Sequence, residues 1–297
     1  MHRMRDTLKR MNRGPMLMIL ATLVLTAMSA SVKVARTELD TLDIVLWRSI
    51  FAIPLAWWWV RRTPLHIQRK GLLAVRITLG FLAMLCFFTA LKGLPLADTN
   101  MITKLQPILI ALGAPLFLGR SERASPRLWG LLVLGLAGTI ILLAPGIRMG
   151  SVWGLWALAS SVFSAGAHIA LRGLKAEHSG VVVFWLQIAV FVMALVLIAI
   201  TKGGLEFPSS HLWPALAGVG IFATGGQLLM THAYAAASAS RVAAVRFVGP
   251  VWGIAADVMF FGGWPEAHVW IGGAIVVSAG LVVTVLRDPG RQAPGSG

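Results

Sequence analysis

Apolar residues fill this chain in ten long runs, and the short gaps between the runs hold charged residues, glycine and proline. Each run has about the 20 residues that a helix needs to cross the hydrocarbon core of a bilayer. No gap is long enough for a separate soluble domain. The pattern predicts an all-α membrane protein whose ten transmembrane helices cover residues 15–35, 42–60, 71–91, 95–119, 126–144, 151–171, 180–201, 212–233, 242–263 and 268–286.

The composition agrees with this prediction and excludes a soluble enzyme. Apolar residues make up 57% of the 297 residues and charged residues 12%, whereas about a quarter of the residues in soluble domains are charged. The sequence has no P-loop, no HExxH and no GxSxG motif, so ATP hydrolysis, zinc proteolysis and hydrolase chemistry lack support. The single cysteine, Cys86, allows no intramolecular disulfide and no cysteine metal cluster. We expect no enzymatic activity, no cofactor and no metal site.

Basic residues outnumber acidic residues by 26 to 11, which gives a net charge of +15. Seventeen of the 26 lie on the side of the N-terminus, in gaps or, for Arg127, at the start of a run. Four lie in gaps on the other side, and five lie in the interiors of the runs. Because cytoplasmic loops carry an excess of lysine and arginine, this distribution predicts that both termini face the cytoplasm. Basic residues in these gaps orient helices and contact anionic lipid, so we expect the lipid bilayer, and no nucleic acid, as their partner.

The two halves of the chain resemble each other. Five helices per half is an odd number, so the halves must insert with opposite orientations, and inverted repeats of this kind place a substrate path between them. We predict a cytoplasmic segment at 1–14, a first repeat at 15–146, a second repeat at 150–286 and a disordered cytoplasmic tail at 287–297. The matches, in chain order, are Thr26, Ser29, Ala30 and Lys33 with Ser161, Ser164, Ala165 and His168, Leu46 and Trp47 with Phe184 and Trp185, Ala97 and Pro107 with Ser240 and Pro250, and Gly130 and Gly138 with Gly272 and Gly280.

Charged residues at membrane depth are the first functional candidates, because they are costly there and normally face protein or water. Lys104 and Arg246 lie deep in their runs. Lys33 and Arg76 lie nearer to helix ends, and we expect both to reach the lipid head groups by snorkelling. Asp257 is the only carboxylate well inside a run, so a carboxylate relay for protons has little support.

Two helical faces combine a deep cation with a helix-breaking residue. We predict that Lys104 and Arg246 contact or gate a substrate, and that the helices hinge at Pro107, Gly249 and Pro250. The alternatives are that the prolines only kink packed helices and that Arg246 has a fixed partner, either Asp257 or a carbonyl group. The two faces are Asn100, Thr103, Lys104 and Pro107, and Arg246, Gly249, Pro250, Gly253 and Asp257.

Further residues are candidates for the wall of a substrate cavity. Hydroxyl, amide and imidazole groups at helical spacing would line a hydrated path, and aromatic or methionine side chains would accept an apolar group. The alternative for the small hydroxyl residues is hydrogen bonding between packed helices. These candidates are Ser29, Ser164, His168 and Gln227 among polar residues, and Phe81, Met84, Phe88, Met101, Trp156 and Trp252 among apolar ones.

The chain resembles the EamA-type drug/metabolite transporter superfamily, and most of all its YddG-type exporters of aromatic and other amino acids. The resemblance implies ten helices in two inverted EamA repeats, a central cavity formed by helices one to four of each half, and a location in the bacterial inner membrane. The first-helix glutamate of small multidrug pumps has no counterpart here. The matching elements are Trp47–Arg48, Ala90–Ala97, Leu105–Pro107, Glu122 and Gly130 with Gly138, and then Ala239–Val242, Val248–Pro250, Glu266 and Gly272 with Gly280.

We therefore expect a transporter that exports amino acids by alternating access, through facilitated diffusion, and that acts as a monomer or weak oligomer. Lys104 and Arg246 would bind the substrate carboxylate. The alternatives are transport of another small organic anion or metabolite, such as a phosphorylated sugar or a nucleoside, proton-linked efflux, and a membrane interaction protein whose polar stripes only pack helices.

Overall fold

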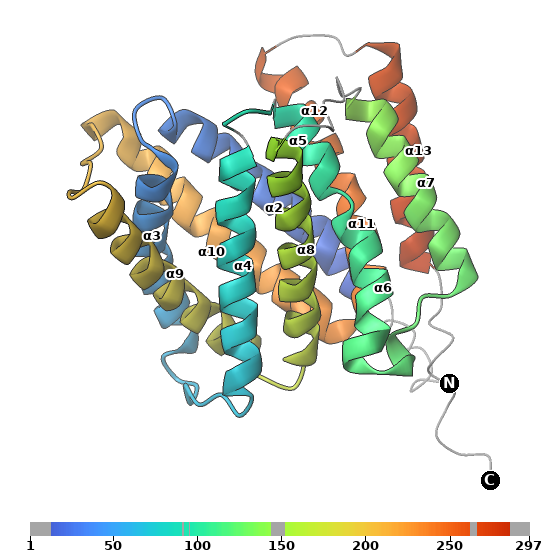
Figure 1. Cartoon of the computed structure of the whole chain (residues 1–297), viewed down its shortest axis with the longest axis horizontal. Helices are drawn as coiled ribbons and strands as arrows, with labels where there is room; N and C mark the ends of the chain where they lie inside the picture. Colours follow the sequence, from blue (N-terminus) through green and yellow to red (C-terminus); the bar gives the residue numbers. More distant parts are fainter. Residues whose placement is uncertain (1–12, 91, 95, 144–151, 262–265, 286–297) are drawn as a thin grey trace.

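The computed structural model describes residues 13–90, 92–94, 96–143, 152–261 and 266–285, in which every regular element is helical (Figure 1). The predicted tail at 287–297 and all but the last two residues of the predicted segment 1–14 lie outside this part of the chain. The elements of the first half are α2 (Arg13–Ala35), α3 (Thr41–Val60), α4 (Lys70–Ala90), α5 (Leu96–Thr103), α6 (Gln106–Leu118), η1 (Arg120–Glu122) and α7 (Pro126–Leu143).

The second half follows the same order of α-helices, three long, two short and one long. Among the described residues, nine helical segments are long and apolar enough to cross a membrane, and they coincide with nine of the ten predicted runs. The ninth run, 242–263, is divided between three short elements. The elements of the second half are α8 (Val152–Gly173), α9 (Ser179–Thr201), η2 (Ser210–Leu212), α10 (Trp213–Ala236), α11 (Ala239–Val245), η3 (Arg246–Val248), α12 (Gly249–Phe261) and α13 (Ala267–Val285).

Proline divides the fourth span into α5 and α6. Pro107, the second residue of α6, has no N–H group, and its ring excludes the carbonyl oxygen four residues earlier from helical geometry. That carbonyl belongs to Thr103, the last residue of α5, and Ser161 of α8 donates a hydrogen bond to it at 3.5 Å. A hydroxyl group on a neighbouring helix thus replaces the missing backbone donor.

The ninth span is divided in the same way. Pro250 is the second residue of α12, and the residue four positions earlier is Arg246, where α11 gives way to the 3-10 turn η3. A tighter turn at this point avoids the clash between the proline ring and the preceding carbonyl group. Both prolines therefore stand at a break between two helices rather than inside a continuous kinked helix.

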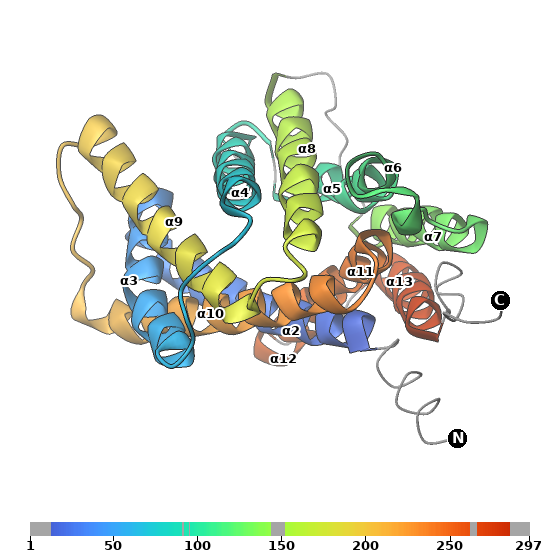
Figure 2. The ribbon, with the colours of Figure 1, turned by 90° about the horizontal axis from the view of Figure 1, so that it is seen from below.

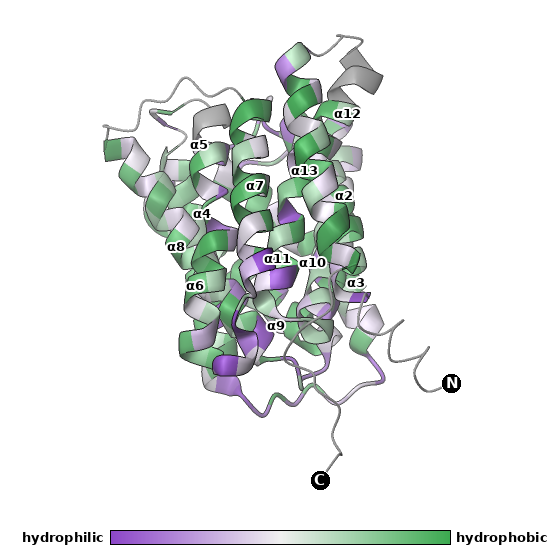
Figure 3. Cartoon of the chain, turned by 90° about the vertical axis from the view of Figure 1, so that its right-hand side faces the viewer, coloured by the Kyte–Doolittle hydropathy of each residue, from purple (hydrophilic) through white to green (hydrophobic). Residues whose placement is uncertain are grey.

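The closest helix pairs each join the first half of the chain to the second. Helix α2 packs along α10, α4 along α8, α3 along α9, and α7 along α13. Figure 2 shows α4, α8 and α6 on one side and α2 and α10 on the other. Apolar residues cover the outward faces of the helices, and many polar residues gather at one end, near both termini (Figure 3). We call that end, where α2 begins and α13 ends, the terminal face.

Glycine allows α7 and α13 to approach within backbone contact, as small residues do at membrane helix interfaces. A Cβ atom added to Gly272 would lie 2.7 Å from the carbonyl oxygen of Gly138, and one added to Gly138 would lie 2.7 Å from Ile275. Gly273, the next residue of α13, has room, because its Cβ would first meet Leu142 at 3.8 Å.

Ion pairs join α3 to α9 at the face opposite the terminal face. Lys202 contacts Asp43, which is fully buried, Asp40 at 2.8 Å and Glu206 at 3.5 Å. Burial lowers the pKa of the Lys202 ammonium, but its hydrogen bonds to Asp40 and Asp43 outweigh burial and raise that pKa above its ordinary value. Because the folded-state pKa is raised, the resulting stability is present at neutral pH and is lost only as the pH rises through that raised value.

The first prediction concerns the α7–α13 contact. Gly272→Ala should destabilise the protein by about 2 kcal/mol, because the methyl group meets backbone atoms that cannot move aside. Gly273→Ala adds the same methyl group to the adjacent position and should leave stability nearly unchanged. Melting temperatures of the two purified variants in detergent check this, and equal melting temperatures would contradict it.

The second prediction concerns Lys202. Lys202→Met leaves the buried carboxylate of Asp43 without its cation and should destabilise the protein by roughly 2–3 kcal/mol. Glu206→Gln removes only an exposed partner, whose side chain is 53% exposed, and should cost far less. Thermal unfolding at neutral pH measures both, and a larger effect of Glu206→Gln would show that the buried pair is not the stabilising one.

Candidate functional site

A cavity of about 330 Å³ lies between α4, α8 and the two breaks that the prolines cause. Its volume is at the lower end of the range for small-molecule sites. The walls combine two cations, amide and hydroxyl groups, and a few apolar side chains. The lining residues are Gly80, Ala83, Met84, Phe87, Asn100, Thr103, Lys104, Gln106, Pro107, Ser160, Ser164 and Arg246.

Two positive charges face this cavity from different halves of the chain. Lys104 comes from the break between α5 and α6, and Arg246 comes from η3. They are close enough to interact electrostatically, and a Cβ atom on Gly249 would lie 3.8 Å from Lys104 Nζ. The cavity lining contains no carboxylate among the described residues. Two like charges without a counter-charge in a membrane interior favour the binding of an anion.

Arg246 is held at the terminal side of the cavity by neutral partners. Its Nη1 donates a hydrogen bond to Gln106 Oε1 at 2.6 Å and lies 3.2 Å from His168 Nε2. Gln106 and His168 are 5% and 6% exposed. We call Arg246, Gln106 and His168 the floor of the cavity. Neutral partners fix the guanidinium group but leave its charge uncompensated.

The two tautomers of His168 support different hydrogen bonds, because a neutral imidazole has one donor and one acceptor nitrogen. With Nδ1 protonated, the ring donates to the Ser164 carbonyl oxygen at 2.6 Å and accepts from Arg246. With Nε2 protonated, it donates toward Met230 Sδ at 3.4 Å and accepts from Gln106 Nε2 at 2.7 Å. The acceptor nitrogen of the ring therefore binds the cation Arg246 in one tautomer and the neutral amide of Gln106 in the other.

The hydroxyl groups of α8 serve two purposes. Ser160 donates to the Ala83 carbonyl oxygen of α4 at 2.8 Å, and Ser161 donates to Thr103. These bonds join helices, as the packing interpretation of the polar stripe predicts. Ser164 lines the cavity, and its carbonyl oxygen is a partner of His168.

The structure brings several of the predicted site residues together. Asn100, Lys104 and Pro107 line the cavity from the fourth span, and they share it with residues far away in the sequence. His168 lies directly behind Arg246. The predicted residues at the cavity are Met84, Asn100, Lys104, Pro107, Ser164 and Arg246.

Other predicted site residues lie away from the cavity lining. Ser29 and Trp156 are exposed on the helix surface, and Trp156 retains 42% of its accessible area. Phe81 is buried, Met101 packs against Leu94 and Ile102, and Phe88 packs beside the contact between α3 and α9. Gln227 accepts a hydrogen bond from Arg76, Trp252 donates to Thr22, and Gly249 and Pro250 begin α12.

Gln106 and Phe87 are cavity residues that the sequence reasoning missed. Gln106 is an amide inside an apolar run, directly before a proline. Its position is a signal that could have been used, because polar groups near a broken membrane helix face protein or a cavity. Phe87 gives no comparable signal, since phenylalanine is equally suited to lipid.

Arg76 corrects one sequence interpretation. It was expected to reach the lipid head groups, but it is only 4% exposed and donates to Gln227 of α10 at 3.4 Å. Snorkelling requires an outward-facing side chain, whereas Arg76 points into the bundle.

The side chain of Asp257, the ion-pair partner of Arg246 in the alternative interpretation, is not among the described ones. The described partners of Arg246 are Gln106 and His168.

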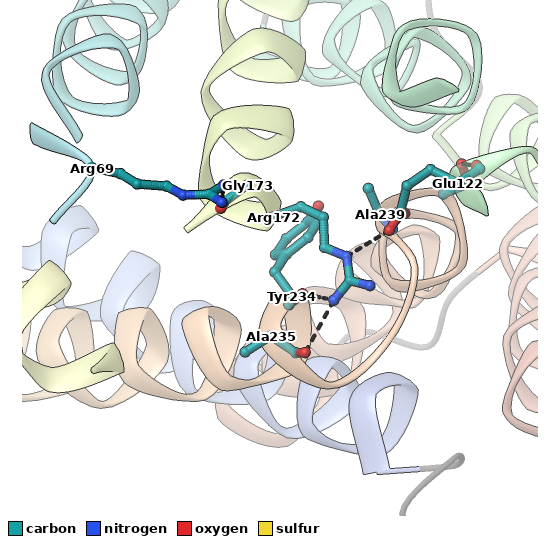
Figure 4. A network of polar contacts seen from close by, with 8 residues as sticks. Arg69, Glu122, Arg172, Gly173, Tyr234, Ala235 and Ala239 are labelled. Carbon is teal, nitrogen blue, oxygen red and sulfur yellow. Dashed lines mark hydrogen bonds and ion pairs between the residues drawn. The ribbon is translucent and has the colours of Figure 1, made fainter. Parts of the chain in front are cut away.

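An ion-pair network closes the terminal face beneath the floor (Figure 4). Glu122 pairs with Arg172 of α8 at 2.8 Å and accepts a hydrogen bond from the Ala239 N–H group of α11 at 2.7 Å. Arg172 also donates to the carbonyl oxygens of Tyr234 and Ala235 in the last turn of α10. One carboxylate and one guanidinium group thereby connect four elements of both halves.

The third prediction tests this closure. Glu122→Gln keeps the size of the side chain but leaves Arg172 without an anion, and it should lower the stability of the protein by about 2–3 kcal/mol. Glu177→Gln neutralises a half-buried carboxylate at the same face, where the amide oxygen can still accept from the Arg69 N–H group and only the longer bond from the Gln68 N–H group, at 3.4 Å, is lost. Thermal unfolding in detergent measures both variants. Equal losses of stability would show that the network contributes no more to stability than an isolated carboxylate at the same face.

Comparison with known proteins confirms the EamA part of the resemblance and leaves the YddG-type part a prediction. The model of the EamA-like transporter family matches residues 12–144 and again residues 151–286. The pseudopaline exporter CntI of Pseudomonas aeruginosa is 30% identical over 277 residues, 91% of this chain and 95% of its own. A riboflavin transporter of Rhizobium johnstonii is 28% identical over 236 residues, 73% and 74% of the two chains. These relatives do not include an amino-acid exporter, so amino-acid export stays a prediction.

The fold has a counterpart among solved structures. A crystal structure that is 19% identical superposes with a TM-score of 0.80, over 92% of this chain and 98% of its own. This likeness shows the fold, and the two family matches cover nearly the whole sequence. The protein is a multi-pass membrane transporter that belongs to the EamA-like transporter family.

Proposed function

We propose that this transporter moves small carboxylate-bearing metabolites, amino acids among them, across the membrane by alternating access. The observation that carries the proposal is that Lys104 and Arg246 line the same cavity, close to each other, and that the described lining holds no carboxylate. Charge-assisted hydrogen bonds from both cations would hold a carboxylate group more strongly than neutral donors could. The cavity volume of about 330 Å³ suits a small metabolite.

The remaining lining residues suit the rest of an amino acid. An apolar side chain would lie against Ala83, Met84 and Phe87, which line the cavity from α4. The ammonium group would be bound by neutral acceptors, the amide oxygen of Asn100 and the hydroxyl group of Ser164. Neutral acceptors tolerate an ammonium group but do not require one.

A larger organic anion is the second candidate substrate. The described lining offers no carboxylate to an ammonium group, so a metabolite that carries acidic groups alone would fit the charge of the cavity as well. Relatives that export pseudopaline or transport riboflavin support a substrate range beyond amino acids.

Alternating access is supported by the way in which the two halves pair. We propose that they are inverted five-helix repeats. If the halves are exchanged, the pair of α2 with α10 becomes the pair of α8 with α4, and the pairs α3 with α9 and α7 with α13 map onto themselves. The breaks at Pro107 and Pro250 would let α5 and α11 tilt relative to α6 and α12, which is how broken helices serve transporters.

We further propose that the termini lie in the cytoplasm of a bacterial cell, that net transport is outward, and that it proceeds by facilitated diffusion.

The fourth prediction uses three probes of matched shape and different charge in vesicles with the reconstituted protein. Labelled phenylalanine and N-acetylphenylalanine, which carry a carboxylate, should show saturable and competable flux. Phenylalaninamide, which lacks a carboxylate and carries a positive charge, should not. Saturable flux of the amide alone, or no saturable flux of either carboxylate, would refute the proposed substrate class.

The same vesicles test the two cations. Lys104→Ala and Arg246→Ala should each raise the half-saturating concentration of the carboxylate probe roughly tenfold or more, the effect of losing one charge-assisted hydrogen bond. Lys92→Ala removes an exposed cation just after the last residue of α4, outside the cavity lining, and should leave the flux unchanged. Unchanged flux in both cavity variants would refute their assignment.

A further inference from the structure

A further cation, which is buried, lies one helical turn from the cavity. Arg76 precedes cavity-lining Gly80 by four residues on α4, so both residues share a face of that helix. A Cβ atom added to Gly80 would lie 2.6 Å from Arg76 Nη1. The guanidinium group of Arg76 therefore packs directly against a residue that lines the cavity, on the side of the terminal face.

Arg76 lacks the partners that a buried guanidinium group normally has. It is 4% exposed, its Nη2 donates one long hydrogen bond of 3.4 Å to Gln227, and its Nε has no partner. No described carboxylate pairs with it, and the charged group that acts on it is Arg246, a second cation. Burying a charge in this way is costly unless a ligand compensates for it in another state of the protein.

A second unpaired donor lies nearby. The hydroxyl group of Tyr234 is fully buried, its O–H group has no acceptor, and it lies close to the guanidinium groups of Arg76 and Arg246, of which Arg246 can donate to its oxygen. The ring of Tyr234 lies 5.3 Å from the ring of His168, a residue of the floor. Hydrogen-bond donors and positive charge thus accumulate between the floor and the closure at Arg172, whose guanidinium group binds the backbone of Tyr234.

We propose that Arg76, Gln227 and Tyr234 form a second anion site, on the terminal side of the floor, which receives the carboxylate group of the substrate when the terminal face opens. This inference rests on the proposed function. Arg76 Nε and the Tyr234 hydroxyl group are the free donors for the carboxylate oxygens, and Gln227 orients the guanidinium group through Nη2. The ligand class is a carboxylate or an oxyanion of similar size.

The site extends the path of positive charge through the membrane. A carboxylate that leaves Lys104 and Arg246 in the direction of the terminal face meets Arg76 next, so it is not transferred into an apolar region without a counter-charge. Gly80 makes this arrangement possible, because any side chain at that position would displace the guanidinium group.

The first test measures access and charge preference without any transported substrate. Gln227→Cys in a Cys86→Ala background places one thiol beside Arg76. Two membrane-impermeant methanethiosulfonates, the anionic sulfonatoethyl and the cationic trimethylammonioethyl reagent, are added to the terminal face of vesicles. We expect reaction from that face and a rate ratio that favours the anionic reagent, and adding Arg76→Met should reduce this ratio about tenfold or more. No reaction from the terminal face, or a ratio that Arg76→Met leaves unchanged, would overturn the proposal.

The second test measures N-acetylphenylalanine flux from each face. Arg76→Met should raise the half-saturating concentration at the terminal face about tenfold, with a change of less than about threefold at the other face, and Arg76→Lys should restore part of the loss. Gly80→Ala keeps the charge but displaces it and should act in the same direction. Gly71→Ala on the same helix, where a Cβ atom meets nothing within 4 Å, is its control.

Arg48→Met controls for the loss of a buried arginine, because Arg48 donates to Gln187 between α3 and α9, away from the cavity lining. Equal effects of Arg76→Met and Arg48→Met at both faces would show a structural role only and overturn the inference. If wild-type protein carries no N-acetylphenylalanine, the proposed substrate class fails, while the ratio of the two thiol reagents still decides whether the anion site exists.

Discussion

The free-energy cost of placing a charge in the membrane interior is the constraint that shapes this structure most. Three arginines lie at membrane depth, and each donates to the amide oxygen of a glutamine on another helix: Arg48 to Gln187, Arg76 to Gln227 and Arg246 to Gln106. A carboxylate partner would bind more strongly and would cancel the charge. An amide partner satisfies one donor and orients the guanidinium group but leaves the positive charge available to an anion.

A second constraint comes from the backbone. In hydrocarbon every carbonyl oxygen needs a donor, so the breaks before Pro107 and Pro250 can exist only where other groups replace the lost bonds. Ser161 does so for Thr103. The break in turn frees Lys104 from regular helix and turns it toward the space that Arg246 enters from the other half. The position of the two cations therefore depends on the prolines that break the helices and on the serine that replaces a lost hydrogen bond.

Hydropathy predicted the fold well because the bilayer imposes one length and one composition on every span, and nine of the ten runs match helical segments in the described residues. Helical periodicity also placed Asn100, Lys104 and Pro107 on one face, since spacing along a single helix depends on local geometry alone. It failed for Arg76, because depth along a helix does not say which way a side chain points. Neighbours such as Gln227, more than a hundred residues away, decide that direction.

The histidine in the floor adds a constraint on energetics. When the proton of His168 moves from Nδ1 to Nε2, the ring exchanges Arg246 and Ser164 for Gln106 and Met230 as partners, and its net charge stays the same. The floor can thus release one hydrogen bond of its arginine and form it again with no ion taken from either compartment, while Gln106 keeps the other bond. A conformational cycle that used this exchange would therefore move no proton across the membrane.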